Sequence, residues 1–449
     1  MRKILLIGAG RSSRYLIQYL LQHAEAGDWM LRVADVSEES ARMKIGSHPR
    51  GSAVSLDIHH DQKRKKEIDD SDLVISLLPA DLHLSVAQDC VAARKNMLTA
   101  SYVSDGMRLL QHDAVAAGVA LINECGLDPG IDHMSAMKVI HEIRTAGGEL
   151  SSFKSYTGGL VAPESNDNPW GYKFSWNPRN VILAGHGTAR YIDHGRYKYI
   201  PYYRLFSEAN KITIENLGEF DGYANRDSLA YRHIYGIDKI PTLIRGTLRQ
   251  SGYCRAWNIF VQLGLTDDSY IVEDAGRLTH AQLVSAFLPT QNSQLSLRRR
   301  LADFAGEKED SAIMEMISWT GILDETPIGH TVATPASILQ HLLEQKWLLK
   351  DTDRDMIVMQ HEFEYRLGGK NILRRDSMVV TGENQELTAM AKTVGLPLAM
   401  TAKIMMEGKI KSTGVIIPVV PEIYEPVLAE LSEWNIRFHE TLTDLPSGR

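Results

Sequence analysis

The chain has 449 residues, enough for two or three domains, because one domain typically runs to ~100–200 residues. Its formal net charge is -7, with 23% of residues charged, which argues against a general nucleic-acid surface, because such a surface needs a basic excess on one face. Three cysteines without a CxxC pair support neither a disulfide framework nor a thiolate zinc site.

The opening segment MRKILLIGAG contains an apolar run that is far shorter than the ~20 residues needed to span a bilayer. No later stretch of the sequence has a membrane-spanning pattern either. We therefore expect a soluble cytoplasmic protein that binds neither a membrane nor nucleic acid, and we leave a homodimer open.

Apolar runs alternate with helical patterns over the first 126 residues. The predicted strands are Lys3–Gly8, Leu31–Val36, Ala53–Ile58, Asp72–Pro79, Asn96–Val103 and Val119–Gly126. The predicted helices are Tyr15–His23, Leu82–Ala93 and Gly106–Ala117. Continuously apolar strands that alternate with helices are typical of a parallel sheet covered on both faces. The sequence therefore predicts an α/β fold with a Rossmann-type doubly wound sheet.

The segment GAGRSS follows the first predicted strand and opens a helix. Gly8 permits a tight turn, and Gly10 lets the backbone approach a pyrophosphate at the helix N-terminus, which is formed by Arg11, Ser12 and Ser13. Ser13 replaces the third glycine of the dinucleotide fingerprint, but it is small and able to donate to a phosphate. We predict dinucleotide binding here; the alternative is that the glycines serve only the turn.

Asp35 ends the second predicted strand, where the fingerprint places an acid for the ribose 2′-hydroxyl. A carboxylate at this point repels a 2′-phosphate, so the residue favours NAD over NADP as cofactor. The alternative is a cap or turn aspartate, and Ser37 already offers capping chemistry nearby.

Other predicted strand ends place polar groups at the same rim of the sheet, where ligands of doubly wound folds collect. Leu78, Ser101, Tyr102 and Asp128 lie at these ends. We predict that Tyr102 and Asp128 share one crevice; the alternative is a tyrosine that bonds only to backbone. Asp132 is predicted to cap the helix that begins near His133.

Further polar groups follow in the middle of the chain. The stretch from Ser155 to Trp176 is predicted to be a long functional loop that contributes Lys173 and Trp176. Arginines in NRDS and IRGTLR, which are Arg226, Arg245 and Arg249, suit a polyanionic ligand because guanidinium binds carboxylates bidentately. Individually, each arginine is also explained by a surface ion pair.

These segments resemble the saccharopine dehydrogenase family, in its glutamate-forming class. The matching segments are ISLLPADLH, TASYVS, NECGLDPGIDHM, APESNDNPWGYKFSW, NRDS, RGTLR, RDMIVMQHEFEY, AMAKTVGLPLAM and GKIKSTGVIIP, and they cover essentially the whole chain. The resemblance implies oxidation of saccharopine by NAD(P) and water, to glutamate and 2-aminoadipate 6-semialdehyde.

The resemblance also implies site residues. Tyr102 and Asp128 are expected at the junction of nicotinamide and substrate as the catalytic pair, Asp128 positioning the cofactor or amine and Tyr102 donating hydrogen bonds. The expected cofactor-binding residues are Gly8, Gly10, Arg11, Ser12, Ser13, Asp35, Leu78, Ser101, Tyr102 and Asp128. The expected substrate-binding residues are Ser101, Tyr102, Asp128, Lys173, Trp176, Arg226, Thr247, Leu248 and Arg249.

One residue departs from the family pattern. Relatives carry SYCGG where this chain has Thr157 within SYTGG. Either the cysteine is not essential, or the activity is shifted toward a related imine reductase such as carboxynorspermidine dehydrogenase. A remaining alternative is a non-catalytic NAD-binding interaction protein.

Three domains are expected. Residues 1–126 with approximately 390–449 form the dinucleotide-binding domain, 127–265 with approximately 352–389 form the substrate domain, and 266–351 form a helical insertion. The strand pattern from Asp355 to Leu367 belongs to the substrate domain, and AMAKTVGLPLAM is predicted to lie in a helix interrupted by Gly395 and Pro397. No histidine spacing suggests a metal site.

Overall fold

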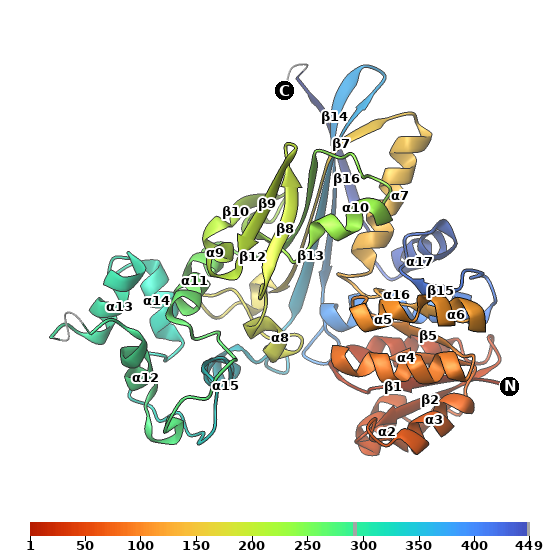
Figure 1. The fold of residues 1–449 in the computed structure, drawn as a ribbon, viewed down its shortest axis with the longest axis horizontal. Coiled ribbons are helices and arrows are strands. Elements are labelled where there is room, and N and C mark those ends of the chain that lie inside the picture. The colour runs from red at the N-terminus through yellow and green to blue at the C-terminus, as the bar shows by residue number, and fades with distance from the viewer. Residues whose placement is uncertain (291–293, 447–449) are drawn as a thin grey trace. The chain divides into compact units, whose positions relative to one another are not determined.

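The computed structural model describes residues 1–290 and 294–446, and it divides into two compact units. Unit 1 comprises Met1–Leu150 and Tyr365–Arg449, and unit 2 comprises Ser151–Glu364. Figure 1 shows the elements of both units along the chain. The division into three domains that the sequence suggested stays a prediction.

Unit 1 is built on a seven-stranded sheet with the order β15-β6-β5-β4-β1-β2-β3. Every pairing in it is parallel, which confirms the predicted doubly wound sheet. Its strands are β1 Arg2–Ile7, β2 Trp29–Asp35, β3 Gly51–Ser55, β4 Leu73–Ser76, β5 Asn96–Thr99, β6 Ala120–Ile122 and β15 Gly414–Ile416. Strand order reverses between β1 and β4, so a ligand crevice is expected beside these two strands.

Helices cover both faces of this sheet, because its strands are apolar on both sides. The helices of unit 1 are α1 Arg14–Gln22, α2 Glu38–Ile45, α3 Asp61–Asp69, α4 His83–Ala92, α5 Asp105–Leu109, α6 Gln111–Ala117, α7 Ile131–Thr145, α16 Ala389–Met406 and α17 Pro421–Glu433. Helices α3, α4 and α6 contribute Ile68, Val86 and Ala114 to the core on one face. Helix α1 packs against α16, which in turn packs against α17.

Helix α16 corrects the prediction of an interrupted helix. It is continuous through Gly395 and Pro397. A Cβ on Gly395 would lie 3.1 Å from the carbonyl oxygen of Ser12, so the glycine allows α16 to approach the beginning of α1 closely. Close helix packing, and not a chain break, therefore explains this glycine.

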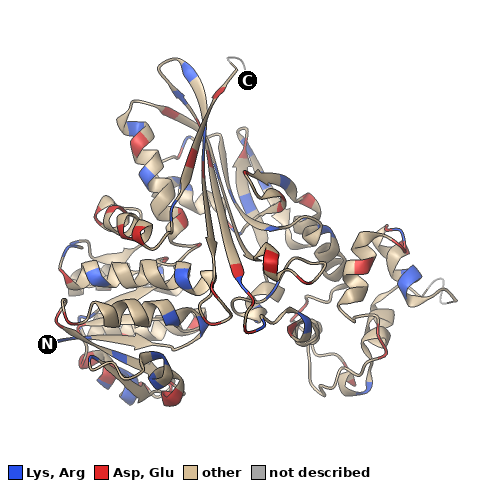
Figure 2. Ribbon diagram, turned by 180° about the vertical axis from the view of Figure 1, so that it is seen from behind, with Lys and Arg blue, Asp and Glu red and all other residues tan. Residues whose placement is uncertain are grey.

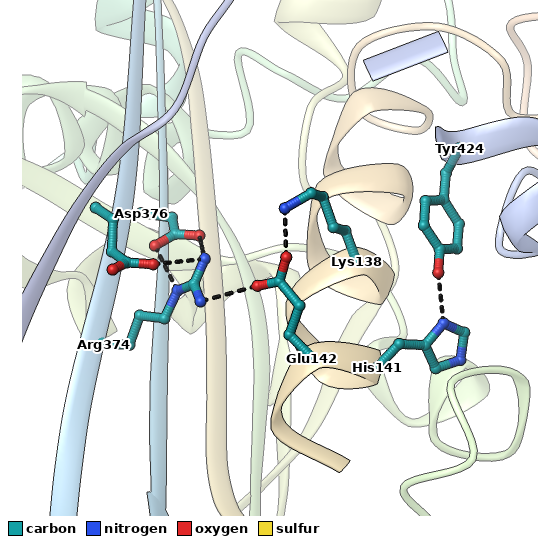
Figure 3. Close-up of polar contacts among 7 residues, drawn as sticks. Lys138, His141, Glu142, Arg374, Asp376 and Tyr424 are labelled. Atoms are coloured by element: carbon teal, nitrogen blue, oxygen red, sulfur yellow. Dashed lines mark hydrogen bonds and ion pairs between the residues drawn. The ribbon is translucent and has the colours of Figure 1, made fainter. Parts of the chain in front are cut away.

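Unit 1 also contains the antiparallel pair β14 Lys370–Thr381 and β16 His439–Leu445. Arg374 on β14 bonds both oxygens of Asp376 at 2.9 Å, and it pairs with Glu142 of α7 at 3.0 Å and with Glu440 of β16 at 2.9 Å. Figure 3 shows Arg374 between Asp376 and Glu142, with Lys138 bound to the same glutamate and His141 facing Tyr424. One guanidinium therefore joins three elements of the unit.

Unit 2 holds a mixed sheet in which β10, β11, β12, β7 and β13 are successive neighbours. Its strands are β7 Glu149–Val161, β8 Thr188–Asp193, β9 Arg196–Pro201, β10 Asn210–Ile214, β11 Gly218–Ala224, β12 Thr242–Gln250 and β13 Asp355–Leu367. Strand β13 has the bounds that its alternating pattern predicted. Strands β7 and β13 carry the chain across the boundaries between the units.

The helices of unit 2 include those predicted between His280 and Lys350. They are α8 Pro178–Ile182, α9 Tyr202–Leu205, α10 Tyr231–Ile234, α11 Tyr253–Leu263, α12 His280–Phe287, α13 Leu297–Ala305, α14 Ala312–Trp319 and α15 Pro335–Trp347. Helices α11 to α15 contribute to one apolar cluster that also includes Trp170 and Tyr172. No helix in the described part of the chain is both long enough and apolar enough to cross a membrane.

Candidate active site

The turn after β1 has the backbone geometry of a phosphate-binding loop. Gly8 adopts φ +104°, and a Cβ there would lie 2.8 Å from the carbonyl oxygen of Leu77, at the end of β4. Glycine is therefore required at this close approach of two strand ends. A Cβ on Gly10 would meet nothing within 4 Å, so the space beside this backbone is open. That open space fits the close approach of a pyrophosphate.

The three residues after Gly10 form a short 3-10 helix, Arg11–Ser13, that leads into α1. Arg11 is exposed, Ser12 is half-buried and Ser13 is fully buried. The Ser13 hydroxyl donates to the carbonyl of Gly10 at 2.8 Å. Its single O–H is therefore used within the turn, and donation of Ser13 to a phosphate stays a prediction.

Asp35 lies at the end of β2, as predicted, and its carboxylate is held by backbone amides. It accepts from the N–H of Ala9 at 2.7 Å and from the N–H of Ser37 at 2.9 Å. Ser37 caps α2 by accepting from the N–H of Ser40. The carboxylate of Asp35 therefore ties the end of β2 to the phosphate turn.

Lys44 of α2 contacts the phosphate turn, and the sequence did not predict this contact. Its ammonium donates to the carbonyl of Ala9 at 2.5 Å and to the hydroxyl of Ser13 at 3.0 Å. Burial lowers the pKa of Lys44, and the positive charge of Arg14 lowers it further. Lys44 lies three residues after Ala41 and one before Ile45, the two buried residues of α2, and this spacing could have indicated that Lys44 faces the sheet and not solvent.

A buried chain of hydrogen bonds links the ends of β4 and β5. His83 Nδ1 lies 2.8 Å from the hydroxyl of Ser76, and His83 Nε2 lies 2.8 Å from the hydroxyl of Ser101. Burial lowers the pKa of His83 to about 4, so the imidazole is neutral near pH 7. His83, in the first turn of α4, therefore orients the half-buried Ser101. Leu78 is also half-buried and lies in the segment between β4 and α4.

Tyr102 and Asp128 are brought together, as predicted. The phenol O–H of Tyr102 donates to Asp128 Oδ1 at 3.2 Å, and both residues are half-buried. The pair lies at the carboxyl ends of β5 and β6, on the rim that carries Ser101. Helix α7 begins at Ile131, near the predicted start, but Asp132 lies inside it and Gly130 is the N-cap, so the prediction of Asp132 as the capping residue is wrong. The side chain of Asp132 accepts from the N–H of Gly130.

Arg249 of β12 is a deeply buried cation among the predicted substrate anchors. The residue is 4% exposed, and its guanidinium lies over the rings of Tyr172 and Tyr253 at 5.2 and 5.4 Å. Its Nε has no hydrogen-bond partner, and no ion pair reaches it from the described residues. Burial raises the pKa of Tyr172, Tyr223 and Tyr253, so these phenols stay neutral and provide no counter-charge.

Thr157 shares the sheet face of Arg249. It pairs in register with Thr247 of the neighbouring parallel strand, and Thr247 lies two residues before Arg249. Residues in register and two apart along a strand face the same side. The Thr157 hydroxyl is buried without a partner. Thr157 lies on strand β7, which corrects the prediction of a loop over Ser155–Val161.

The other predicted anchors differ in their surroundings. Trp176 donates from Nε1 to the hydroxyl of Tyr172 at 3.2 Å, which places it beside the Arg249 cluster. Lys173 is 2% exposed and is held by Asp353 at 2.6 Å and Asp167 at 2.8 Å. Its charge is therefore already compensated within the protein.

Arg226 and Leu248 complete the set. Arg226 is exposed in the turn after β11, with φ +47°. Leu248 is fully buried and points to the face opposite Arg249, where a Cβ on Gly158 would lie 2.8 Å from its own Cβ. The side chain of Leu248 is therefore a packing group, and only its backbone is on the strand that carries Arg249.

Charged residues are interspersed on the elements of both units, as Figure 2 shows. Among the residues that the structure describes, no three histidine, cysteine or acidic side chains are grouped so that they could hold a metal ion.

Comparison with protein families matches nearly the whole chain in two parts. Residues 4–122 match the saccharopine dehydrogenase NADP binding domain, and residues 126–436 match the saccharopine dehydrogenase C-terminal domain. The Saccharomyces cerevisiae protein named saccharopine dehydrogenase [NADP(+), L-glutamate-forming] is 33% identical over 96% of this chain and 97% of its own length. The mouse mitochondrial alpha-aminoadipic semialdehyde synthase is 35% identical over 98% of this chain, which corresponds to 48% of the mouse protein.

Solved structures give the same result for the fold. The apo saccharopine dehydrogenase (L-Glu forming) from Saccharomyces cerevisiae has a TM-score of 0.87 and 32% identity, over 99% of this chain and all of the other. The homospermidine synthase from Legionella pneumophila has a TM-score of 0.55 and 8% identity, over 99% of this chain and 92% of the other, and it shares the fold alone.

These comparisons overturn the predicted preference for NAD. The matching N-terminal domain is an NADP binding domain, and the relatives from Saccharomyces cerevisiae and Schizosaccharomyces pombe are both named for NADP(+). The prediction rested on repulsion by Asp35, whose carboxylate is instead engaged by two backbone amides. The matches to both domains and the full-length relatives show that the chain belongs to the saccharopine dehydrogenase family, a family of oxidoreductases.

Proposed function

We propose that this protein oxidises saccharopine with NADP⁺ and water to L-glutamate and 2-aminoadipate 6-semialdehyde, or catalyses the reverse reaction. The names of its full-length relatives from two yeasts support this assignment. Saccharopine is an amine with three carboxylates, so its recognition requires buried or clustered cations.

Arg249 is the observation that carries the proposal. A buried guanidinium without a carboxylate partner is costly, and binding of an anion offsets that cost. The neutral rings of Tyr172 and Tyr253 shape its surroundings without neutralising the charge. Arg249 is therefore assigned to bind a substrate carboxylate, with Thr157 and Thr247 on the same sheet face.

The cofactor is assigned to unit 1. The turn Gly8–Ser13 is expected to hold the pyrophosphate, because its backbone is open at Gly10 and leads into a helix N-terminus. Lys44 adds a positive charge to this turn. Asp35 and Leu78 flank the turn at the ends of β2 and β4. When bound, the nicotinamide accepts a hydride from the carbon beside the secondary amine.

Tyr102 and Asp128 are assigned to the substrate amine and the nicotinamide junction. The carboxylate of Asp128 accepts from the phenol, so it orients the O–H of Tyr102. A carboxylate accepts more than one hydrogen bond, so we assign the substrate amine to it as a further donor. Loss of hydride then leaves an imine on the substrate, water adds to it, and the resulting carbinolamine breaks down to release glutamate. Ser101, held by His83, provides a further hydroxyl at this rim.

A related imine reductase acting on carboxynorspermidine is a second candidate. Thr157 favours it, because its hydroxyl lies without a partner on the face of Arg249, at a position where the family resemblance leads us to expect cysteine. A substrate with a different arrangement of charges would then use this hydroxyl as a hydrogen-bond group.

Turnover of the purified full chain separates the candidates. NADPH or NADH formation is followed at 340 nm with saccharopine or carboxynorspermidine, and glutamate is identified among the products. We expect saccharopine to be oxidised with a higher kcat/KM for NADP⁺ than for NAD⁺. Turnover of carboxynorspermidine alone would select the second candidate, and turnover of neither compound would refute both.

A further inference from the structure

Glu124 occupies an unusual position between β6 and α7. Its backbone has φ +60°, a left-handed conformation that residues other than glycine and asparagine adopt rarely. The side chain is nevertheless 3% exposed, so a carboxylate is buried at a strained point of the chain. Such a combination persists only where the surrounding structure enforces it, and it is common near functional sites.

The contacts of Glu124 lie on both sides of Tyr102. Its N–H donates to the carbonyl of Ser101 at 3.1 Å, and its Oε1 accepts from the N–H of Val103 at 3.0 Å. These two bonds hold the carbonyl of the residue before Tyr102 and the amide of the residue after it. Because those two groups limit the backbone of Tyr102, they also limit the direction in which its phenol leaves the chain.

The second carboxylate oxygen reaches α7. Glu124 Oε2 accepts from Nε2 of His133 at 2.7 Å, and His133 is fully buried. The other ring nitrogen lies 3.7 Å from Asp132, which in turn accepts from the N–H of Gly130 at 2.6 Å. Gly130 closes the turn that carries Asp128. One buried cluster therefore contacts the segment of the phenol and the turn of its carboxylate partner.

We propose that Glu124 is a positioning residue for the Tyr102–Asp128 pair. It fixes the segment Ser101–Val103 directly, and it connects that segment through His133 and Asp132 to the turn of Asp128. The inference rests on the proposed function, which gives Tyr102 and Asp128 their roles. It assigns a purpose to two residues of the NECGLDPGIDHM segment, Glu124 and His133, that neither sheet packing nor helix capping explains.

A Glu124→Gly variant removes the carboxylate and accepts the left-handed backbone. We expect kcat with saccharopine to fall by about 10- to 100-fold, because a small misplacement of a catalytic group costs rate on this scale. Asp28→Gly is the matched control, since Asp28 is an exposed acid of the same unit with φ +51°. The control is expected to keep the wild-type kcat.

A double-mutant cycle distinguishes positioning from general stability. In a Tyr102→Phe background, Glu124→Gly is expected to cause no further loss of kcat, because the group that it positions is already absent. An equal loss in both backgrounds would overturn the proposal. If Glu124→Gly does not fold, Glu124→Asn replaces it, because asparagine tolerates the same backbone and is too short to make both contacts.

Hydrogen exchange tests the inference without turnover. The amide of Val103 is expected to exchange faster in Glu124→Gly than in the wild type, while amides of β1 keep their rates. Unchanged exchange at Val103 would refute the proposed contact. If the wild-type protein oxidises no saccharopine, the proposed function fails, but the exchange experiment still decides whether Glu124 holds this segment.

Discussion

The polar groups at the two predicted ligand-binding regions differ in their partners. At the strand ends of unit 1 they are compensated by neighbours: Asp35 by two amides, His83 by two hydroxyls, and Glu124 by an amide and a histidine. In unit 2 the Nε of Arg249 and the hydroxyl of Thr157 lack partners among the described residues. The contrast supports the proposal that the protein itself assembles the cofactor-binding strand ends, whereas a bound substrate completes the hydrogen bonding around Arg249 and Thr157.

A further compensated group of unit 1 is Arg374 with its three carboxylate partners, Asp376, Glu142 and Glu440. Substitution of Arg374 removes the shared cation. Arg374→Met leaves the 5% exposed side chain of Asp376 without its bidentate partner, and we expect the free energy of unfolding to fall by about 3–5 kcal/mol. Denaturant unfolding measures this change. Arg366→Met is the control, because Arg366 is exposed and its ion pair with Glu149 is 3.5 Å long, and it should cost less than about 1 kcal/mol.

Substitution of Arg249, which has no carboxylate partner among the described residues, is expected to reduce activity without reducing stability. Arg249→Met should lower kcat/KM for saccharopine by about 10²- to 10³-fold, because a charge-assisted anchor is lost. Stability of the ligand-free protein should stay the same or rise, since an unpaired buried charge is removed. NADP⁺ affinity, measured by calorimetry, should not change. A variant that loses both stability and cofactor affinity would show that Arg249 is structural.

The pH dependence of stability tests whether His83 is neutral and hydrogen-bonded in the folded protein. The folded pKa of His83 is about 4, so the unfolded chain binds its proton first as pH falls below about 6.5. The free energy of unfolding should therefore decline between pH 6.5 and 4, by up to about 3 kcal/mol from this group. His83→Gln should remove that part of the slope, with the exposed His112→Gln as control. Identical slopes in the wild type and His83→Gln would contradict the assignment.

The smallest expected effect is at Thr157. Thr157→Val removes a hydroxyl without a partner, so stability should change by less than about 1 kcal/mol or rise slightly. Thr320→Val is the matched variant, because that buried hydroxyl donates to the carbonyl of Ile317 at 2.7 Å, and it should lose about 1 kcal/mol or more. Thermal unfolding measures both. Equal losses would mean that the Thr157 hydroxyl has a partner.

Local patterns predicted much of the fold. The parallel sheet of unit 1 follows from apolar runs that alternate with helical patterns, and β13 follows from an apolar stretch whose second half alternates with polar residues. The same patterns failed at glycines whose role is to allow a close approach of two segments, because that role depends on tertiary packing. Gly395 was predicted to interrupt a helix but allows contact with Ser12, and Gly158 was predicted in a loop but lies on β7 beside Leu248 of the neighbouring strand β12.

Only part of the candidate site was predicted, because many of its contacts also depend on tertiary packing. The Tyr102–Asp128 contact follows from two strand ends of one parallel sheet. The contacts of Glu124 with His133, of Lys44 with Ala9 and of Lys173 with Asp353 join segments whose spacing in the sequence carries no signal. The NAD preference failed because an acid at the end of β2 was assigned a ligand before its backbone partners were known.

The packing of α16 on the beginning of α1 has a consequence for biosynthesis. Gly395 meets Ser12 from a helix that leaves the ribosome hundreds of residues after the phosphate turn. Strands β1 to β6 therefore emerge before β15, the remaining strand of the sheet, and before α16, the helix that packs on this turn. A chain that ends before α16 has both glycines of the phosphate turn but lacks the helix that packs behind it, so we expect such a chain to bind the cofactor more weakly than the full chain.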